Sequence, residues 1–528
     1  MRVGFKMKQH WKILLWLIAG VVVGFALQRF TDGPGTVGVR FDPQPVVVDG
    51  VPVGIRVDAL VQDLLPKGRN ASEGLQVGDV VKRITVNAGM DDEKGAEITS
   101  AEALTEFLEQ RGAGGVATIE LVSGNKRSAL VALDPQSTRA RWLAPFKFVA
   151  DIFMRLLKML IMPLVVTSIV TGVAGLGGGS DFGRMGGRTF GYYATTSFLA
   201  VGLGMLLVNI LQPGIGARLG ISPDADFGQR SENWLDILRR MVPENAFNAF
   251  TGNGNMLQVI FFSLLFGFFI TKVAEKPRNF MLDLFGSAFA VVMRMASWVM
   301  LLVPYGVFCL LVKVVGETGF DVFKPLGAYM LTVMLALIIH SCVILPLLLK
   351  VVGGVSPLKW VRAMSPALMT AFSTSSSSMT LPTTLNILKK RGGVSNRTSS
   401  FVAPLGATVN MDGTALYECI GVVFLAQYYA SAGDFVLSFS AQVTVVMAAF
   451  LASIGAAGIP SAGLVMMLTI LSALKLPLEG AALLLAVDRP LDMCRTVVNV
   501  WSDTVGTAII ASKEGETGLG DGAVTDPT

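Results

Sequence analysis

Long apolar stretches constrain what this chain can fold into more than any other feature of its sequence. A stretch of about 20 apolar residues is long enough to cross the hydrocarbon core of a bilayer as a helix. Stretches of this kind occupy residues 11–27, 148–173, 192–211, 259–273, 289–315 and 326–352. Charged residues make up only 15% of the chain, compared with about 25% in soluble proteins. These features predict an all-α polytopic membrane protein.

The charges between these stretches predict how the chain is oriented in the membrane. Basic residues lie before or at the start of the first stretch: Arg2, Lys6, Lys8 and Lys12. The later loops alternate in charge, beginning with a basic loop around Arg184 and an acidic loop at residues 224–232. Because positively charged loops remain in the cytoplasm, we expect an uncleaved first span and cytoplasmic N- and C-termini.

Composition excludes several classes of enzyme and binding protein. The two histidines, His10 and His340, belong to no H-E-x-x-H zinc motif. The four cysteines lie inside apolar stretches, which is typical of small buried side chains rather than of a disulfide framework. The net charge of +5 is spread over short loops, whereas nucleic-acid binding requires a basic stripe. We expect no enzymatic activity, no cofactor and no nucleic-acid partner.

Residues 43–135 differ from the rest because they are polar and contain short β-type runs with one helical pattern. They predict a small α+β domain, which should be extracytoplasmic because it follows an in-to-out span. It resembles a PDZ domain: residues 74–81, GLQVGDVV, are similar to the G-L-x-x-G-D-x-I turn, and residues 54–57 lie where the carboxylate-binding loop would be. The resemblance implies a peptide ligand; the alternative is a structural insertion without one.

Two segments in the last third of the chain predict re-entrant hairpins. Residues 365–388 carry a serine-rich centre and basic residues at both ends, so both ends should be cytoplasmic and the serine tip should lie within the membrane. Residues 441–474 have a centre of small residues and Pro. Each is followed by an apolar segment with polar groups, and such an inverted repeat indicates a transporter's binding site. A serine protease site is disfavoured because no Lys or His neighbours the serines, and His340 lies in another segment.

The segment at residues 481–511 carries a polar stripe. At about 100° per residue, one helical face collects six side chains: Asp488, Asp492, Arg495, Thr496, Asn499 and Asp503. The simpler alternative is a structural ion pair between Asp492 and Arg495. Ionisable groups inside a membrane are costly and usually functional, so the stripe predicts a binding site.

The segment at residues 401–430 is interrupted by Asn410, Met411, Asp412, Gly413 and Thr414. Carboxylate, amide and carbonyl oxygens are the ligands of hard cations, and an unwound turn at Gly413 would add carbonyls. The alternative is a glycine kink capped by Asn410. Glu418 follows one turn later without a basic neighbour in its span, so it is a candidate proton carrier or, alternatively, a carboxyl group hydrogen-bonded in place.

Four motifs together resemble the glutamate transporter family of dicarboxylate/amino acid:cation symporters: SSSSMTLP, NMDGTALY, ASIGAAGIP and DMCRTVVNV followed by Asp503. The resemblance covers about residues 145–513 and implies eight transmembrane helices, two re-entrant hairpins, a homotrimer, an elevator motion and a bacterial inner-membrane location. The division it implies is 1–42 (N-terminus and first helix), 43–135 (PDZ-like insert), 136–352 (helices 2–6), 353–513 (transport core) and 514–528 (cytoplasmic tail).

The resemblance also implies the site residues. Arg495 would bind the substrate's side-chain carboxylate, Asp492 its ammonium group, and Asn499 with the first hairpin tip its α-carboxylate. The remaining contacts would come from Ser375, Ser376, Ser377, Thr414, Thr496, Ile459 and Gly463. The sodium ligands would be, in three groups, Gly406, Asn410, Asn499 and Asp503; Thr408, Met411, Ser453 and Ile454; and Tyr193, Thr196, Ser197, Asn410 and Asp412. Glu418 matches the family's proton-carrying pattern.

The function implied is sodium-coupled, and also proton-coupled, symport of glutamate or aspartate. The alternative is a C4-dicarboxylate or neutral amino-acid symporter of the same fold, which Asp492 disfavours for dicarboxylates because they have no ammonium group. The chain departs from the family's patterns at Ser375 and Met493, where archaeal and mammalian members respectively carry arginine. Potassium counter-transport is therefore left open.

Overall fold

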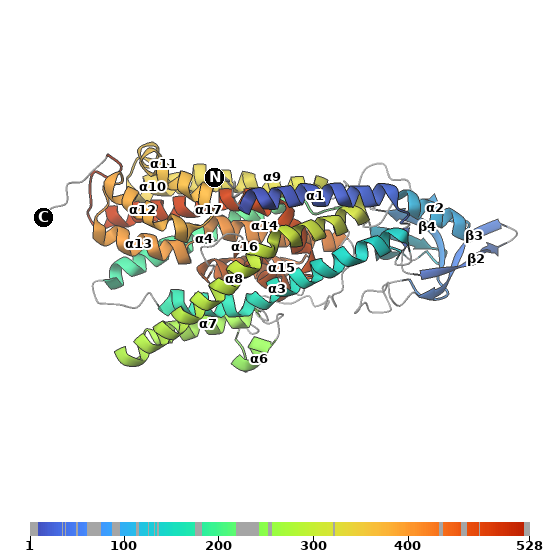
Figure 1. Ribbon diagram of the computed structural model, residues 1–528, viewed down its shortest axis with the longest axis horizontal. Coiled ribbons are helices and arrows are strands. Elements are labelled where there is room, and N and C mark those ends of the chain that lie inside the picture. The colour runs from blue at the N-terminus through green and yellow to red at the C-terminus, as the bar shows by residue number, and fades with distance from the viewer. Residues whose placement is uncertain are drawn as a thin grey trace, which may run out of the picture.

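The computed structural model describes residues 9–521 except for 34, 37–38, 49–50, 61–74, 87–95, 112–115, 125, 131, 135–136, 175–181, 218–241, 252–255, 320–322, 432–436, 456–461 and 475. The described chain is mostly helical, and a β-rich unit stands at one end of a long helical body (Figure 1). Within the described residues, five helical segments are long and apolar enough to cross a membrane, and three shorter helices are also apolar.

One group of helices packs around the long α8 (Glu275–Thr318). The helices α1 (Gln9–Phe30) and α3 (Thr138–Ala174) pack against α8, α7 (Met256–Ile270) packs against α3, and the short α6 (Ala246–Thr251) packs against α7. Gly20 and Gly24 allow α1 to approach α8 closely, since a Cβ at Gly20 would lie 2.9 Å from the Phe308 carbonyl oxygen. The apolar stretch predicted to begin at residue 289 was placed too late, because α8 already begins at Glu275.

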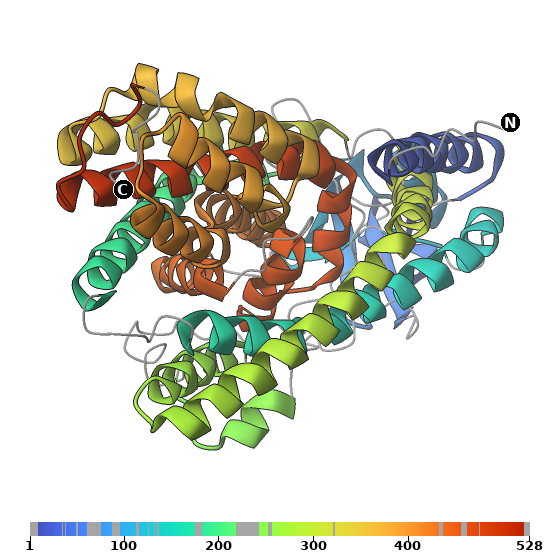
Figure 2. The ribbon, with the colours of Figure 1, turned by 60° about the vertical axis from the view of Figure 1, so that its left-hand side comes forward.

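A second group surrounds α14 (Asp412–Ser431), in which every residue from Asp412 to Tyr429 is buried. Figure 2 separates this group from the helices around α8. Its other members are α4 (Phe182–Leu211), α9 (Phe323–Ile339), the π-helical turn η3 (His340–Ile344), α10 (Leu345–Gly353), α11 (Pro357–Thr374), α12 (Ser377–Lys390), α13 (Asn396–Val409), α15 (Phe439–Gly455), α16 (Ala462–Ala473) and α17 (Glu479–Lys513).

The β-rich unit is an antiparallel sheet with the strand order β2-β3-β4-β6-β7 and one helix, α2 (Ala101–Arg111). The strands are β2 (Val39–Val48), β3 (Val51–Leu60), β4 (Val80–Val86), β6 (Val116–Leu121) and β7 (Lys126–Leu130), and β5 (Ala96–Glu97) pairs with β4. A separate two-stranded ribbon joins β1 (Gly35–Thr36) to β8 (Ala132–Leu133). Alternate strand residues such as Ile55, Val57 and Ile84 form the core with Leu104 and Leu108 of α2.

The prediction that residues 54–57 form a carboxylate-binding loop is wrong. Gly54 and Ile55 lie inside β3, where Gly54 pairs with Val46 of β2 and Ile55 pairs with Val81 of β4. A Cβ at Gly54 would lie 2.3 Å from the Val81 carbonyl oxygen, so the glycine serves the close approach of two strands. This backbone is paired within the sheet and is not a free cradle for a peptide terminus.

Arg139, in the first turn of α3, fixes the base of the β-rich unit. Its Nη2 donates to the carbonyl oxygens of Gln28 at 2.8 Å and Thr31 at 2.7 Å, and its Nη1 donates to that of Gly33 at 3.5 Å. These carbonyls lie at and beyond the end of α1, where helical carbonyls lack intrahelical partners. One side chain therefore ties together the two helices between which the β-rich unit is inserted.

Residues 514–521, the tail segment, close the opposite end of the α14 group. Both Glu516 carboxylate oxygens bind the start of α13, accepting from the Ser395 backbone N–H at 2.8 Å and from the Thr398 hydroxyl at 2.6 Å. Glu514 pairs with Arg188 of α4 at 2.8 Å. A further ion pair joins Asp521 to Lys359 of α11 at 2.7 Å. The tail segment thus connects α4, α11, α13 and α17.

Candidate functional site

The first half of α17 carries four charged side chains that we call the arginine cluster: Asp488, Arg489, Asp492 and Arg495. Arg495 is almost completely buried, and its Nη2 donates to Asp488 Oδ1 at 3.0 Å and to Asp492 Oδ1 at 2.8 Å. Arg489 Nη1 lies 3.4 Å from Asp492 Oδ2. The spacing of four and three residues places the two aspartates and Arg495 on one helical face. Two positive and two negative charges leave the cluster without net charge.

Arg495 keeps one edge of its guanidinium free. Its Nε and Nη1 are buried and have no hydrogen-bond partner among the described residues. The ring of Tyr417 lies under the guanidinium, with the Arg495 Cζ atom 3.7 Å from the ring centroid. A Cβ at Gly463 would come within 2.7 Å of Nη1 and within 3.0 Å of Thr414 Cγ2, so glycine keeps this edge accessible. A free, fixed guanidinium edge can bind a carboxylate through two hydrogen bonds.

The tip between α11 and α12 is buried and polar. Ser375 has a φ of 50°, a left-handed conformation that is uncommon outside glycine and often marks a functional position. Ser376 caps α12 by accepting from the Met379 N–H at 3.2 Å, and Ser377 is the first residue of that helix. The first turn of a helix presents backbone N–H groups to an anion. The tip can therefore bind a second carboxylate.

The helical interruption lies at Asn410 and Met411, between α13 and α14. Asn410 connects this interruption to two helices, α17 and α4: its Nδ2 donates to Ser502 Oγ at 3.0 Å and Asp503 Oδ1 at 2.9 Å, and its Oδ1 accepts from Thr196 at 3.3 Å. The prediction of an unwound turn at Gly413 is wrong by two to three residues. Gly413 is helical, and a Cβ there would lie 2.8 Å from the Arg495 carbonyl oxygen.

Asp412 is fully buried and accepts hydrogen bonds from three segments. Its Oδ1 accepts from Ser197 at 2.8 Å, and its Oδ2 accepts from Ser502 at 2.6 Å and lies 3.2 Å from His340 Nε2. Asp503 is equally buried, and a Cβ at Gly406 would lie 2.4 Å from its Oδ1. We call Asp412, Asp503 and their partners Asn410, Ser197, Ser502 and His340 the carboxylate cluster.

The chemistry of the carboxylate cluster suits a cation. The hydrogen bonds to its two acidic groups come from hydroxyl, amide and imidazole groups, and no Lys or Arg ion pair joins either one among the described residues. Hard cations prefer carboxylate, hydroxyl and carbonyl oxygens. No group of three His, Cys, Asp or Glu suited to a metal ion occurs in the described part of the chain.

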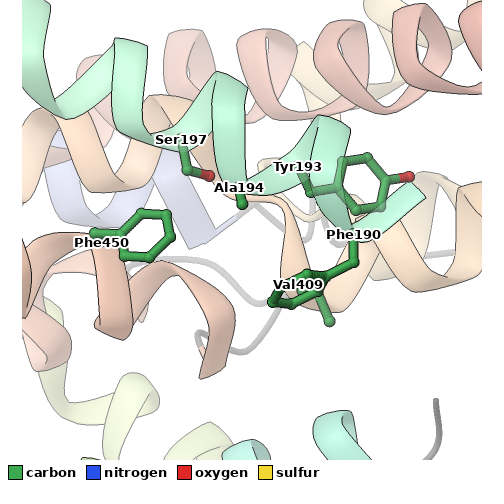
Figure 3. Close-up of a pocket in the computed structure, with 6 residues that line it drawn as sticks. All are labelled: Phe190, Tyr193, Ala194, Ser197, Val409 and Phe450. Atoms are coloured by element: carbon green, nitrogen blue, oxygen red, sulfur yellow. The ribbon is translucent and has the colours of Figure 1, made fainter. Parts of the chain in front are cut away.

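A narrow pocket adjoins this cluster and is lined by Phe190, Tyr193, Ala194, Ser197, Val409 and Phe450 (Figure 3). It has no room for a water molecule and its walls are almost entirely apolar. Tyr193 turns its hydroxyl away to the Val402 carbonyl oxygen at 2.8 Å. Of the carboxylate cluster, Ser197 therefore lines this pocket, together with the aromatic rings of Phe190 and Phe450.

The remaining residues that were predicted to bind substrate or sodium lie in neither cluster. Asn499 joins α17 to the start of α14, since its Oδ1 accepts from the Gly413 N–H at 2.8 Å and its Nδ2 donates to Thr414 Oγ1 at 3.1 Å. The Thr408 and Ser453 hydroxyls donate within their own helices, to Leu405 and Phe450. Thr496 donates to the Asp492 carbonyl oxygen, and Met411 is buried. Ile454 is the second-last residue of α15. Ile459 falls outside the described residues.

Glu418 is completely buried in α14, and neither of its carboxyl oxygens has a hydrogen-bond partner among the described residues. The prediction of a carboxyl group hydrogen-bonded in place is therefore disfavoured. The charged group with which it interacts electrostatically is Arg495. A buried carboxyl group without partners is most stable when it is protonated.

Three residues that contact the clusters were missed or discounted by sequence analysis. His340 lies in the π-helical turn η3 and touches Asp412, although its segment shows no other polar motif. The sequence did offer a reason to select His340, because a lone ionisable residue inside an apolar stretch is usually functional. Ser502 flanks the polar stripe, and Tyr417 lies three residues after Thr414. Neither is distinguishable from an ordinary helical residue without the packing.

Comparison with known proteins agrees with this chemistry. The model of the sodium:dicarboxylate symporter family matches residues 119–513. Excitatory amino acid transporter 3 of Oryctolagus cuniculus is 37% identical over 420 residues, covering 69% of this chain and 78% of that protein. Human excitatory amino acid transporter 2 is 36% identical over 420 residues, covering 69% and 72%. An excitatory amino acid transporter of Caenorhabditis elegans is 35% identical over 409 residues, covering 69% and 80%.

Proposed function

This chain belongs to the sodium:dicarboxylate symporter family, and from this premise we propose that it carries glutamate or aspartate across the membrane together with sodium. It is a membrane transporter and not an enzyme. The observation that carries the proposal is the buried Arg495, whose Nε and Nη1 have no partner among the described residues. A buried guanidinium with an unused edge is suited to a carboxylate, so the side chain of an acidic amino acid satisfies it.

The remaining substrate contacts are proposed from the charges around that edge. Asp492 receives the ammonium group, because it is the carboxylate nearest to the Arg495 guanidinium, with its Oδ1 2.8 Å from Nη2. The α-carboxylate is bound by Asn499 and by the N–H groups of the first hairpin tip, where α12 begins. The pocket is completed by Ser375, Ser376, Ser377, Thr414, Thr496, Ile459 and Gly463.

Sodium is proposed to occupy the carboxylate cluster. Two buried carboxylates held by neutral donors attract a cation, and a bound ion would offset the cost of burying both charges. One site uses Gly406, Asn410, Asn499 and Asp503. A second uses Tyr193, Thr196, Ser197, Asn410 and Asp412, of which Ser197 and Asp412 are already hydrogen-bonded. A third, near the second hairpin, uses Thr408, Met411, Ser453 and Ile454.

Proton coupling is proposed to depend on Glu418. A carboxyl group without a hydrogen-bond partner can bind and release a proton as the charges around it change. The nearby charge is that of Arg495, and a substrate carboxylate arriving at Arg495 neutralises it. Substrate binding therefore favours a proton on Glu418, which is the requirement for carrying both together.

The moving part is proposed to be the α14 group with α17 and the hairpins, sliding against α1, α3, α7 and α8. The arginine cluster lies on α17, and the carboxylate cluster joins α17 to α4, η3 and α14. The substrate and the ions would therefore move together within one packed unit. The homotrimer and the cytoplasmic location of both termini stay predictions from the family resemblance and the loop charges.

The experiment that tests the function is uptake of radiolabelled aspartate and glutamate into proteoliposomes. A sodium gradient should drive accumulation, and replacing sodium with choline should abolish it. Arg495→Ala should abolish uptake, whereas Arg397→Ala, which removes an exposed arginine of α13, should not. Sodium-independent uptake, or none of either amino acid by the folded protein, would refute the proposal.

A further inference from the structure

Trp501 of α17 is a buried side chain to which the proposed transport cycle assigns no role. Its indole Nε1 donates to the carbonyl oxygen of Ser341 in η3 at 3.1 Å. We propose that Trp501 is a positioning residue for sodium binding: by binding this carbonyl it holds η3 in the conformation that keeps His340 on Asp412. This inference rests on the proposed function, because it requires the carboxylate cluster to be a sodium site.

The Ser341 carbonyl is open to a side-chain donor because the two nearest backbone positions do not supply one. In an α-helix this oxygen would accept from the N–H of Leu345, four residues later. In the π-helical turn the Leu345 N–H instead donates to the His340 carbonyl, five residues earlier. The next residue, Pro346, has no N–H. A carbonyl without a partner is costly where water is excluded, so the indole of Trp501 satisfies an acceptor that this turn leaves open.

The π-helical turn also explains how His340 reaches the carboxylate cluster. His340 is buried at the end of α9, whereas Leu345 and Leu349 form the buried face of α10. At about 100° per residue, a regular helix would place His340 and Leu345 about 140° apart. The wider i→i+5 turn reduces this angle, and both residues are fully buried. Loss of the turn would therefore move His340 away from Asp412, whose Oδ2 lies 3.2 Å from His340 Nε2.

Trp501 and the residue after it act on the same carboxylate oxygen by two routes. Ser502 Oγ donates directly to Asp412 Oδ2 at 2.6 Å, and His340 lies at the same oxygen. Trp501 binds the turn that carries His340. Two consecutive residues of α17 thus govern two contacts of one proposed sodium ligand. A small shift of η3 would change one of these contacts without removing any ligand.

A purely structural role for Trp501 is the alternative. Its ring belongs to a hydrophobic cluster with Leu345, Leu349 and Val505, so losing the ring would destabilise the fold whether or not it acts on sodium. Trp501→Phe keeps an aromatic ring and removes the N–H, which separates the hydrogen bond from most of the packing. A double-mutant cycle then distinguishes the two roles, because changes that act independently are additive and changes that act through a shared partner are not.

The test measures the sodium dependence of aspartate binding in the full-length protein. Trp501→Phe should weaken sodium affinity about fivefold, less than the tenfold expected for a direct partner of the ligand such as His340. In a His340→Phe background the same change should have little further effect, because the residue through which it acts is gone. Trp298→Phe changes an exposed tryptophan of α8 and is the control. Thermal unfolding shows whether each variant is folded.

An unchanged sodium affinity in Trp501→Phe would overturn the inference, and so would an equal loss in the wild-type and His340→Phe backgrounds. A second measurement needs no variant. Because coupling between two sites is reciprocal, sodium should slow hydrogen exchange of the wild-type amides within residues 342–349. Exchange that is the same with and without sodium would also overturn the inference. Failure of the proposed function is different, since wild-type aspartate binding would then not depend on sodium at all.

Discussion

The arginine cluster lies entirely on α17, whereas the carboxylate cluster combines α17 with three other segments, and the two differ in their balance of charge. The arginine cluster contains two guanidinium and two carboxylate groups that contact one another directly, so it has no net charge. The carboxylate cluster contains Asp412 and Asp503, which are held by hydroxyls, an amide and an imidazole. We therefore propose that the first exchanges internal partners for those of a charged substrate, and that the second, which has no Lys or Arg partner among the described residues, binds a cation.

Their separation along α17 shows how the two can act together. Asp492 and Asp503 are eleven residues apart, or about 16 Å along the helix axis. Asn499 lies between them and binds both Gly413 and Thr414 at the start of α14. Asn499 thus fixes the part of α17 between the two clusters to the start of α14.

The largest expected effect is that of Arg495→Ala, which leaves the arginine cluster with two negative charges and one positive charge. Asp488 and Asp492 would lose their shared partner, and removing one member of a buried ion pair costs about 3–5 kcal/mol. We expect loss of measurable aspartate binding and a lower melting temperature. Isothermal titration calorimetry and thermal unfolding in detergent measure the two effects, with Arg397→Ala as the control. Wild-type aspartate affinity in Arg495→Ala would contradict the assignment.

Next in size are Asp412→Asn and Asp503→Asn, which remove one negative charge each from the carboxylate cluster. A unit charge about 4 Å from a cation contributes about 4 kcal/mol at the effective dielectric constant near a protein surface, so sodium affinity should fall by about a hundredfold or more. The sodium dependence of aspartate binding measures this. Asp283→Asn changes an exposed aspartate of α8 and serves as the control. If sodium dependence survives in both variants, these residues are not cation ligands.

His340→Phe should have a smaller effect on the same cluster. It removes the imidazole 3.2 Å from Asp412 Oδ2 without removing a ligand, and loss of an outer partner commonly weakens ion binding by about tenfold. His340→Gln keeps a donor and should recover part of the affinity. Sodium titrations at fixed aspartate compare the two. Equal sodium affinities in His340→Phe and His340→Gln would show that the hydrogen bond between residue 340 and Asp412 does not contribute to sodium binding.

Glu418→Gln should leave both clusters intact and change only the response to pH. The amide mimics a permanently protonated carboxyl group, so aspartate binding should stay close to wild type. Net uptake should lose its dependence on an imposed pH gradient. Proteoliposomes with fixed sodium and clamped voltage provide the measurement, and Glu275→Gln on α8 is the exposed control. A wild-type protein that ignores the pH gradient would make Glu418 a structural residue.

The smallest expected effect is that of Glu516→Gln, which lies in neither cluster. It weakens the charged hydrogen bonds at the start of α13 and should cost about 1 kcal/mol of stability, like the loss of other helix caps. Substrate and sodium affinities should stay unchanged. Thermal unfolding and the two titrations distinguish these outcomes. An altered sodium affinity with an unaltered melting temperature would show that the tail segment acts on the carboxylate cluster.

The arginine cluster could be predicted from sequence because its members belong to one helix. A period of 3.6 residues is sufficient to place Asp488, Asp492 and Arg495 on one face. The carboxylate cluster is different, since Ser197 and His340 come from α4 and η3, far away in the chain. Family resemblance supplied Ser197, but His340 has no sequence neighbour that would connect it to Asp412. That contact depends on tertiary packing.

Glycines explain two further errors of sequence analysis. At Gly413 we predicted an unwound turn, because glycine permits unusual backbone conformations, and at Gly54 we predicted a loop from the resemblance to a PDZ domain. In the structure both serve close approach: Gly413 meets the Arg495 carbonyl and Gly54 meets the Val81 carbonyl. Whether a glycine is needed for its conformation or for its lack of a side chain depends on the neighbouring element. The local sequence does not contain that information.

The tail segment also has a consequence for how the protein is made. A chain is synthesised from its N-terminus, so α13 enters the membrane before residues 514–521 exist. Until they emerge, Ser395 and Thr398 lack the carboxylate that binds them, and Arg188 lacks Glu514. A chain that stops after Lys513 would contain every described helix and both clusters, yet one end of the α14 group would stay open. Closure of that end is therefore a late step of biosynthesis, and quality control of nascent chains would encounter the transporter before this step is complete.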